Sequence, residues 1–385
     1  MAEIKIPFNK PGLTGREQTY MADTLQRGHL SGDGYYTKLC NTLIENELGV
    51  SKVMLTTSCT HALEMAALLL DIQPGDEVIV PSFTFVSSIN AFVLRGATPI
   101  FADIRPDTLN LDETRLESLI TEKTRAIVPV HYAGVGCKMD VIGQIATKHN
   151  LAVIEDNAQG LFARYRGQPL GSFGQMATVS FHETKNFVCG EGGALLINDP
   201  AYFERAEIIR EKGTNRGRFF RGQVDKYTWV DLGSSYLPAE VLAGFLWAQL
   251  EAKQEITAKR KAVFEFYEQN LAEWSAANGV RLPIVPEDCE QPYHMFYLLF
   301  PNLEERQSFI GHMRSKGIQT SFHYLPLHLS DMGRKWGYQE GDCPVTEKLS
   351  DALVRLPFYN DLTLAQLEEV VQTVKAFSVG MAHKV

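Results

Sequence analysis

The sequence predicts an α/β protein with a large, doubly wound, mostly parallel sheet and a smaller α+β domain. Between about residues 50 and 200, short apolar runs alternate with helical patterns. The runs are continuously apolar, which is typical of parallel strands covered by helices on both faces. After about residue 250 a long charged helix replaces this alternation. We therefore expect a large domain over residues 1–250, including the N-terminal segment, and a small domain over residues 251–385.

The expected elements of the large domain follow one another as strand and helix. Leu63, Ala66, Ala67 and Leu70 have the spacing of one apolar helix face. Strands are expected at 52–57, 76–82, 97–104, 124–134 and 151–160, and helices at 60–71, 84–96 and 139–150. In such a sheet, ligands bind at the carboxyl ends of the strands.

The C-terminal part has a different pattern. A charged helix is expected over 251–274, a strand over 294–300, and after a further helix a strand over 319–326. Thr363 and Gln366 have the spacing of a capping box and predict the start of a final helix. This order of elements indicates an α+β domain.

The composition excludes several classes of partner. The formal net charge is −9, which disfavours nucleic acid and anionic membrane surfaces. The first residues lack the apolar core of a signal peptide, and no stretch approaches the ~20 apolar residues of a membrane span. We expect a cytoplasmic protein. The six cysteines lack CxxC spacing, which favours reduced structural thiols over disulfides or a metal site.

Familiar cofactor motifs are incomplete in this chain. The segment GVGCKMD has two glycines of a dinucleotide-binding GxGxxG and lacks the third. HETKN begins like the zinc motif HExxH, but Asn186 takes the place of the second histidine. No GxxxxGK[ST] is present, so a phosphate group must be bound in another way.

The segment TTSCTHA, residues 56–62, offers such a phosphate site. It joins a strand to a helix, so the free N–H groups of the first helical turn point to the ligand side of the sheet. Ser58 and Thr60 add hydroxyl groups there. Taken alone, a segment of this kind is more often a plain helix N-cap.

Three further residues lie at the same predicted edge. Asp156 ends a strand, with Glu155 before it and Gln159 three residues later; a structural carboxylate is the alternative. Phe85 begins a helix, where its ring can stack on a planar ligand or pack in the core. Lys185, in SFHETKN, lies on a polar loop before the glycines of GEGG, although an isolated loop lysine is usually only solvated. Together these groups match the needs of pyridoxal phosphate: an anion site, a stacking face, a carboxylate for the pyridinium nitrogen and an amine for the Schiff base.

The segments SFHETKN with GEGG, EDNAQ, TTSCTHALEMA and PSFTFVSSINAFVLRGA resemble the DegT-like sugar aminotransferases of the aspartate aminotransferase fold. The resemblance covers nearly the whole chain and implies fold type I of the pyridoxal-phosphate-dependent transferases. It implies a Schiff base on Lys185, a pyridinium partner in Asp156 and a stacking ring in Phe85. The other expected contacts are Gln159 at the ring hydroxyl, Thr60, His61 and Ser180 at the phosphate, and His323 near the sugar.

The resemblance also implies substrates and assembly. Expected are L-glutamate as amino donor, a nucleotide-linked keto sugar as acceptor, pyridoxamine phosphate as the intermediate cofactor form, and a homodimer with the active site at its interface. A family asparagine that reaches the neighbouring subunit's cofactor is replaced here within GSSYL, where Ser235 is expected to serve. Arg216, Arg218 and Arg221 of NRGRFFRGQ are expected to bind the diphosphate, although such a basic loop is often simply solvated.

The sequence around EKGTNRGRFFRGQVDKYTW is most similar to members of the enterobacterial common antigen pathway. This implies dTDP-4-keto-6-deoxy-D-glucose as acceptor and the galacto-configured 4-amino sugar as product. Open alternatives are the gluco-configured product, another nucleotide keto sugar, and a cofactor-binding sensor or regulator without turnover. A related sugar dehydratase is disfavoured, because such an enzyme is expected to carry histidine in place of Lys185.

Overall fold

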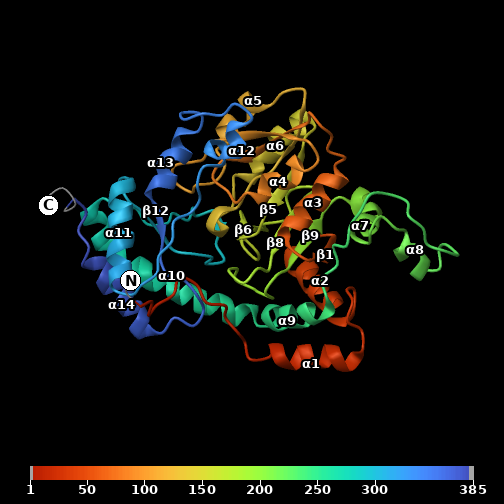
Figure 1. Ribbon diagram of the computed structural model, residues 1–385, viewed down its shortest axis with the longest axis horizontal. Helices are drawn as coiled ribbons and strands as arrows, with labels where there is room; N and C mark the ends of the chain where they lie inside the picture. The colour runs from red at the N-terminus through yellow and green to blue at the C-terminus, as the bar shows by residue number, and fades with distance from the viewer. Residues whose placement is uncertain (1–2, 381–385) are drawn as a thin grey trace.

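A seven-stranded sheet forms the centre of the larger part of the computed structural model, which describes residues 3–380 (Figure 1). The strand order is β1-β9-β8-β5-β4-β2-β3. β9 is antiparallel to both of its neighbours, and the remaining adjacent pairs are parallel. The strands are β1 (Lys52–Thr56), β2 (Glu77–Pro81), β3 (Thr98–Ala102), β4 (Thr124–Ile127), β5 (Ala152–Asp156), β8 (Met176–Ser180) and β9 (Gly193–Ile197). The expected large, mostly parallel sheet is confirmed.

Both faces of this sheet are buried. Val78 and Ile79 are neighbours in β2 and both have 0% exposure, yet they belong to different apolar clusters. This explains the continuous apolar runs, since successive side chains point to opposite faces of a strand. One face carries α3 (Cys59–Leu69) and α4 (Ser87–Val93), and the other carries α2 (Tyr35–Leu48), α6 (Met139–His149) and α9 (Glu240–Glu251).

Smaller elements surround the sheet. α1 (Glu17–Arg27) packs along α9, and α7 (Phe203–Arg210) leads to α8 (Arg216–Phe220). Figure 1 shows α8 at the edge of the molecule, on a segment that extends away from the sheet. The remaining elements here are α5 (Leu116–Leu119) and a small sheet of β6 (Arg164–Tyr165), β7 (Gln168–Pro169) and β10 (Cys289–Glu290).

The C-terminal part has its own apolar core. Its elements are α10 (Lys253–Asn278), β11 (Tyr297–Leu299), α11 (Leu303–Ser315), α12 (Asp331–Arg334), α13 (Pro344–Ala352), β12 (Leu353–Arg355) and α14 (Leu364–Lys375). The capping box that opens α14 is present. The junction of α9 and α10 falls near residue 250, where we predict the domain boundary. Ile6, however, pairs with Ile318 and lies in the C-terminal core, so the N-terminal segment packs on the smaller part.

The prediction of a strand over 319–326 is wrong. This segment forms only an isolated bridge from Ser321 to Arg355 and then runs without regular structure. His323 and Tyr324 turn into a pocket, and Pro326 has no N–H group for a strand ladder. Within residues 3–380, no helix is both long and apolar enough to cross a membrane.

Candidate active site

The loop from β1 to α3 forms an anion cradle. The Ser58 side chain caps the helix by accepting from the His61 N–H at 3.1 Å, which leaves the first-turn N–H groups of Cys59 and Thr60 without intrahelical partners. Gly193 of β9 lies directly against this turn, and a Cβ atom there would be 2.3 Å from the Cys59 nitrogen. Gly193, the last glycine of GEGG, is therefore required for the close approach of β9 to the cradle.

A cavity of about 650 Å³ opens beside the cradle. It lies where β5 and β8 end, and both parts of the chain contribute to its wall. Eight residues singled out from the sequence line this cavity: Ser58, Thr60, Phe85, Asp156, Gln159, Ser180, Lys185 and His323. The structure thus brings together groups that are as far apart in the chain as residues 60 and 323.

Asp156 is held in one orientation at the end of β5. Its side chain is buried, with 6% exposure. The Ser88 hydroxyl donates to Oδ2 at 2.6 Å, and the Ala158 N–H donates to Oδ1 at 3.1 Å. Ser88 Oγ is also 2.8 Å from the hydroxyl oxygen of Thr84. These contacts fix the carboxylate at the cavity wall, where it can pair with a protonated ring nitrogen.

Lys185 lies on the loop between β8 and β9 and reaches into the same cavity. Burial lowers the pKa of its ammonium group below the usual 10.5, and the charges of Cys59 and Asp156 oppose this shift. No side chain within residues 3–380 hydrogen-bonds to its Nζ atom. A desolvated, unpaired amine of this kind is suited to attack a carbonyl carbon.

Phe85 and Gln159 define the sides of the cavity. Phe85 lies two residues before α4 and has 57% exposure, so its ring can stack on a planar group. Gln159 is fixed at both ends: Oε1 accepts from the Ala133 N–H at 2.7 Å, and Nε2 donates to the Tyr324 hydroxyl at 3.1 Å. The amide and the tyrosine are therefore positioned as one unit.

His323 lies on the wall contributed by the C-terminal part. Its Nδ1 is 3.0 Å from the Tyr132 hydroxyl. Burial lowers the pKa of His323 well below 6.5, and the positive charges of Arg355 and Lys185 lower it further. The ring is neutral at physiological pH, and Tyr132 is suited to donate to its unprotonated nitrogen.

Five other residues predicted from the sequence lie outside this cavity. His61 Nδ1 contacts the Thr57 hydroxyl, and its ring packs edge-on against Tyr236. Ser235 is exposed, and its backbone forms an isolated β-bridge with Glu211. The remaining three are Arg216, Arg218 and Arg221 of α8 and its C-cap.

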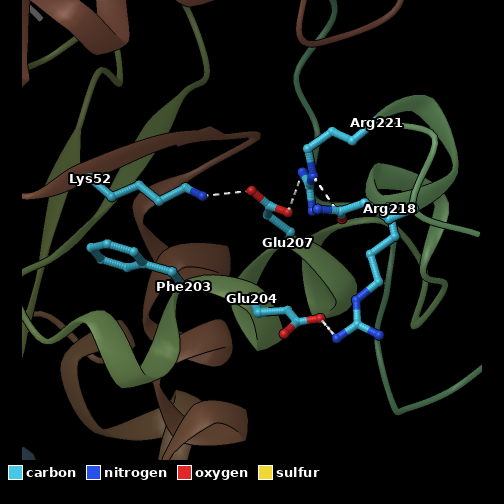
Figure 2. A pocket seen from close by; sticks show the side chains of 7 residues that line it. Lys52, Phe203, Glu204, Glu207, Arg218 and Arg221 are labelled. Carbon is cyan, nitrogen blue, oxygen red and sulfur yellow. Dashed lines mark hydrogen bonds and ion pairs between the residues drawn. The ribbon is translucent and has the colours of Figure 1, made fainter.

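The three arginines form ion pairs near α7. Arg216 binds Glu211 at 2.9 Å, Arg218 binds Glu204, and Arg221 binds Glu207 at 2.9 Å. Figure 2 shows Arg218 and Arg221 around a separate hollow of about 460 Å³. Their assignment to the diphosphate, like the assignments of His61 and Ser235 to the phosphate, stays a prediction.

Two residues of the site were missed from the sequence: Ser88, which is buried behind Asp156, and Arg355 in the cavity wall. Ser88 is one of two adjacent serines, and its bond to Asp156 becomes evident only when α4 is placed against β5. Arg355 also lines the cavity. A signal for Arg355 does exist, because this single charge interrupts the apolar run LVRLPFY.

The residues of the cavity fit pyridoxal phosphate. The cradle at Cys59 and Thr60 suits its phosphate, Phe85 its ring, Asp156 its pyridinium nitrogen and Lys185 its aldehyde. A mostly parallel, doubly wound sheet with this site defines a pyridoxal-phosphate-dependent aminotransferase of fold type I. The chain belongs to the DegT/DnrJ/EryC1/StrS aminotransferase family, whose sequence model matches residues 12–375.

Relatives of known sequence and structure match most of the chain. GDP-perosamine synthase of Escherichia coli O157:H7 is 31% identical over 373 residues, covering 97% of this chain and 98% of the relative. The pleiotropic regulatory protein of Geobacillus stearothermophilus is 35% identical, covering 83% and 82%. The putative sugar aminotransferase Spr1654 of Streptococcus pneumoniae, solved in its PMP form, superposes with a TM-score of 0.90 at 27% identity, covering 97% and 98%. The protein is a pyridoxal-phosphate-dependent sugar aminotransferase.

Proposed function

We propose that the enzyme transfers the amino group of L-glutamate to carbon four of dTDP-4-keto-6-deoxy-D-glucose and releases dTDP-4-amino-4,6-dideoxy-D-galactose. The observation that carries the transfer chemistry is the meeting of Lys185, Asp156 and an anion cradle in one cavity. The choice of sugar depends on the resemblance of the segment KGTNRGRFFRGQVDKYTW.

The protein's own groups have distinct tasks in this reaction. Bound pyridoxal phosphate supplies an electron sink. Asp156 keeps the ring nitrogen protonated, with Ser88 and Ala158 holding its carboxylate in place. Lys185 would hold the cofactor through Nζ and, as a free amine, would accept the proton from the donor's α-carbon. The same lysine returns a proton to carbon four of the sugar.

The configuration of the product depends on which face of the sugar is turned toward Lys185. Because the lysine approaches from one fixed side, the pocket alone decides between the galacto and gluco products. Proton coupling between carbons three and four of the product tests this: small for the axial amine we propose, and large for an equatorial amine.

We propose that the enzyme works as a homodimer. The segment from α8 to α9 exposes large apolar side chains, with Phe220 at 69%, Tyr227 at 52% and Trp229 at 76%. Such a patch on an extended segment is suited to bury against a second copy of the chain. The same segment carries Ser235 and the three arginines, so dimerisation is the step by which they would reach a neighbouring active site. An active monomer in analytical ultracentrifugation would contradict this proposal.

Two alternatives are each favoured by a named relative. The relative named GDP-perosamine synthase favours a GDP-linked keto sugar as acceptor, and the relative named pleiotropic regulatory protein favours a regulatory role. Oxoglutarate formation from L-glutamate, measured with a panel of dTDP- and GDP-linked 4-keto-6-deoxy sugars, distinguishes the proposed function from these two alternatives. We expect the highest kcat/KM with dTDP-4-keto-6-deoxy-D-glucose. No oxoglutarate with any acceptor would favour the regulator. A cytoplasmic location stays a prediction.

A further inference from the structure

A serine, a histidine and a glutamate form a hydrogen-bonded chain between the two parts of the molecule. Ser82, directly after β2, has 0% exposure, and so has His328. Ser82 Oγ is 2.6 Å from His328 Nδ1, and His328 Nε2 is 2.9 Å from Oε1 of Glu347 in α13. None of the three side chains lines the cofactor cavity.

The partners of this chain fix the direction of its hydrogen bonds. The Glu347 carboxylate can only accept, so His328 Nε2 carries a proton and donates to it. With its ring proton on Nε2, His328 accepts through Nδ1 from the Ser82 hydroxyl, whose oxygen accepts in turn from the His328 backbone N–H at 3.3 Å. Glu347 Oε1 also accepts from the backbone N–H groups of Gly341 and Cys343, at 2.9 and 3.3 Å.

The order of these three groups is that of the catalytic triads of serine hydrolases. Ser82 and His328 are fully buried, however, and no acyl substrate can reach the serine oxygen. The chain of hydrogen bonds therefore acts on the segments that it joins.

One of these segments is the loop from β2 to α4, which begins at Ser82. Phe85 of this loop lines the cavity, where its ring is expected to stack on the cofactor. Thr84 lies 2.8 Å from Ser88 through the two hydroxyl oxygens, and Ser88 donates to Asp156. The loop thus carries both a ring for the cofactor and the support of its carboxylate partner.

The other segment ends at His328 and forms a different part of the cavity wall. Tyr324 lies four residues earlier, lines the cavity, and has its ring centroid 6.4 Å from that of Phe85. The Leu327 N–H donates to the Ser82 carbonyl at 3.0 Å, beside the contact between Ser82 and His328. Backbone and side-chain hydrogen bonds therefore join the two walls at one point.

We propose that Ser82, His328 and Glu347 form one positioning unit for the bound cofactor. The unit fixes the wall of Phe85 against the wall of Tyr324, and Glu347 anchors it to α13. A buried polar network whose members are all paired makes its surroundings rigid, which suits this task. The inference concerns how the cofactor is held, so it goes beyond the proposed function and applies to any amino acceptor.

Titration of the full-length, cofactor-free protein with pyridoxal phosphate tests the proposal without turnover. We expect Ser82→Ala and Glu347→Ala each to weaken binding by roughly 3- to 10-fold, because each removes one buried hydrogen bond of the unit. The visible circular dichroism of the bound cofactor should also fall in both variants, since this signal depends on how firmly the ring is held. Ser350→Ala is the matched control. It removes the 2.9 Å hydrogen bond from another buried serine to the Glu347 carbonyl in the same helix, and it should change neither readout.

The double variant Ser82→Ala/Glu347→Ala tests whether the groups act together. Their side chains are linked through the ring of His328. Independent residues would give losses of affinity that multiply, whereas members of one unit give losses that do not. We expect the double variant to bind within about twofold of the weaker single variant.

Three results would overturn the assignment: wild-type affinity in Ser82→Ala, an equal loss in Ser350→Ala, or losses that multiply in the double variant. If Ser82→Ala does not fold, Glu347→Ala decides the question in the same titration, because its side chain is 18% exposed and its loss is milder. Failure of the proposed function looks different. The wild-type protein would then bind the cofactor and form no oxoglutarate with any keto sugar.

Discussion

Replacing Asp156 by asparagine removes the negative charge at the end of β5 and keeps the size of the side chain. The Ala158 N–H can still donate to the remaining carbonyl oxygen, and the Ser88 hydroxyl can turn toward Thr84, whose oxygen is 2.8 Å away. The fold should therefore survive. Loss of one preorganised electrostatic group costs about 10²- to 10³-fold in rate, and we expect this loss in both half-reactions.

Ser88→Ala is a milder change at the same carboxylate. It removes the 2.6 Å hydrogen bond to Oδ2 and leaves both the charge and the contact with Ala158. A hydrogen bond to a charged group at the weak end of its range contributes about 1.5 kcal/mol, so the rate should fall roughly tenfold. Stopped-flow absorbance measures each half-reaction separately. Near-normal rates for Asp156→Asn would mean that Asp156 is only a structural acid and would refute the reasoning.

Three further predictions concern stability and assembly. Glu155→Gln should destabilise the fold by about 3–5 kcal/mol in chemical denaturation. The reason is that the fully buried carboxylate accepts hydrogen bonds from the backbone of Gly171 and Gly174 and from His131. A loss of stability below about 1 kcal/mol would contradict this prediction. The pKa values of His294 and His323 lie well below 6.5 in the folded state, so the unfolded chain binds more protons below pH 6.5. Stability should fall on acidification by about 1.4 kcal/mol per pH unit for each histidine, and His323→Gln should make the fall less steep. If the proposed homodimer forms through this patch, Trp229→Asp should shift it to monomer in ultracentrifugation, whereas an unchanged dimer would place the interface elsewhere.

The sheet could be predicted because its strands carry the signal in their own residues. Burial on both faces requires continuous apolar runs, and the short lengths of these runs separate them from helices. Asp156 and Lys185 could be singled out for the same reason, since polar residues stand out where apolar strands end. The expected strand over 319–326 was wrong because its side chains are committed to the cavity, a constraint that appears only in three dimensions.

Contacts between distant segments could not be predicted from local patterns. Arg355 and Lys185 are separated by 170 positions, and only the packing of the two parts of the chain brings them to one cavity. The arginines of α8 show the opposite case. Their spacing indicates a basic loop, but the chain alone cannot reveal that Glu204 and Glu207 of α7 lie opposite two of them.

Reduction of the cofactor-loaded enzyme with borohydride, followed by peptide mapping, tests the central claim most directly. The chemistry described here requires the cofactor to be held covalently by Lys185 before the amino donor arrives. We expect the reduced cofactor on the peptide containing SFHETKN, attached to Lys185, and we expect Lys185→Ala to give no label and no turnover. A label on another lysine, or full activity of the alanine variant, would contradict it.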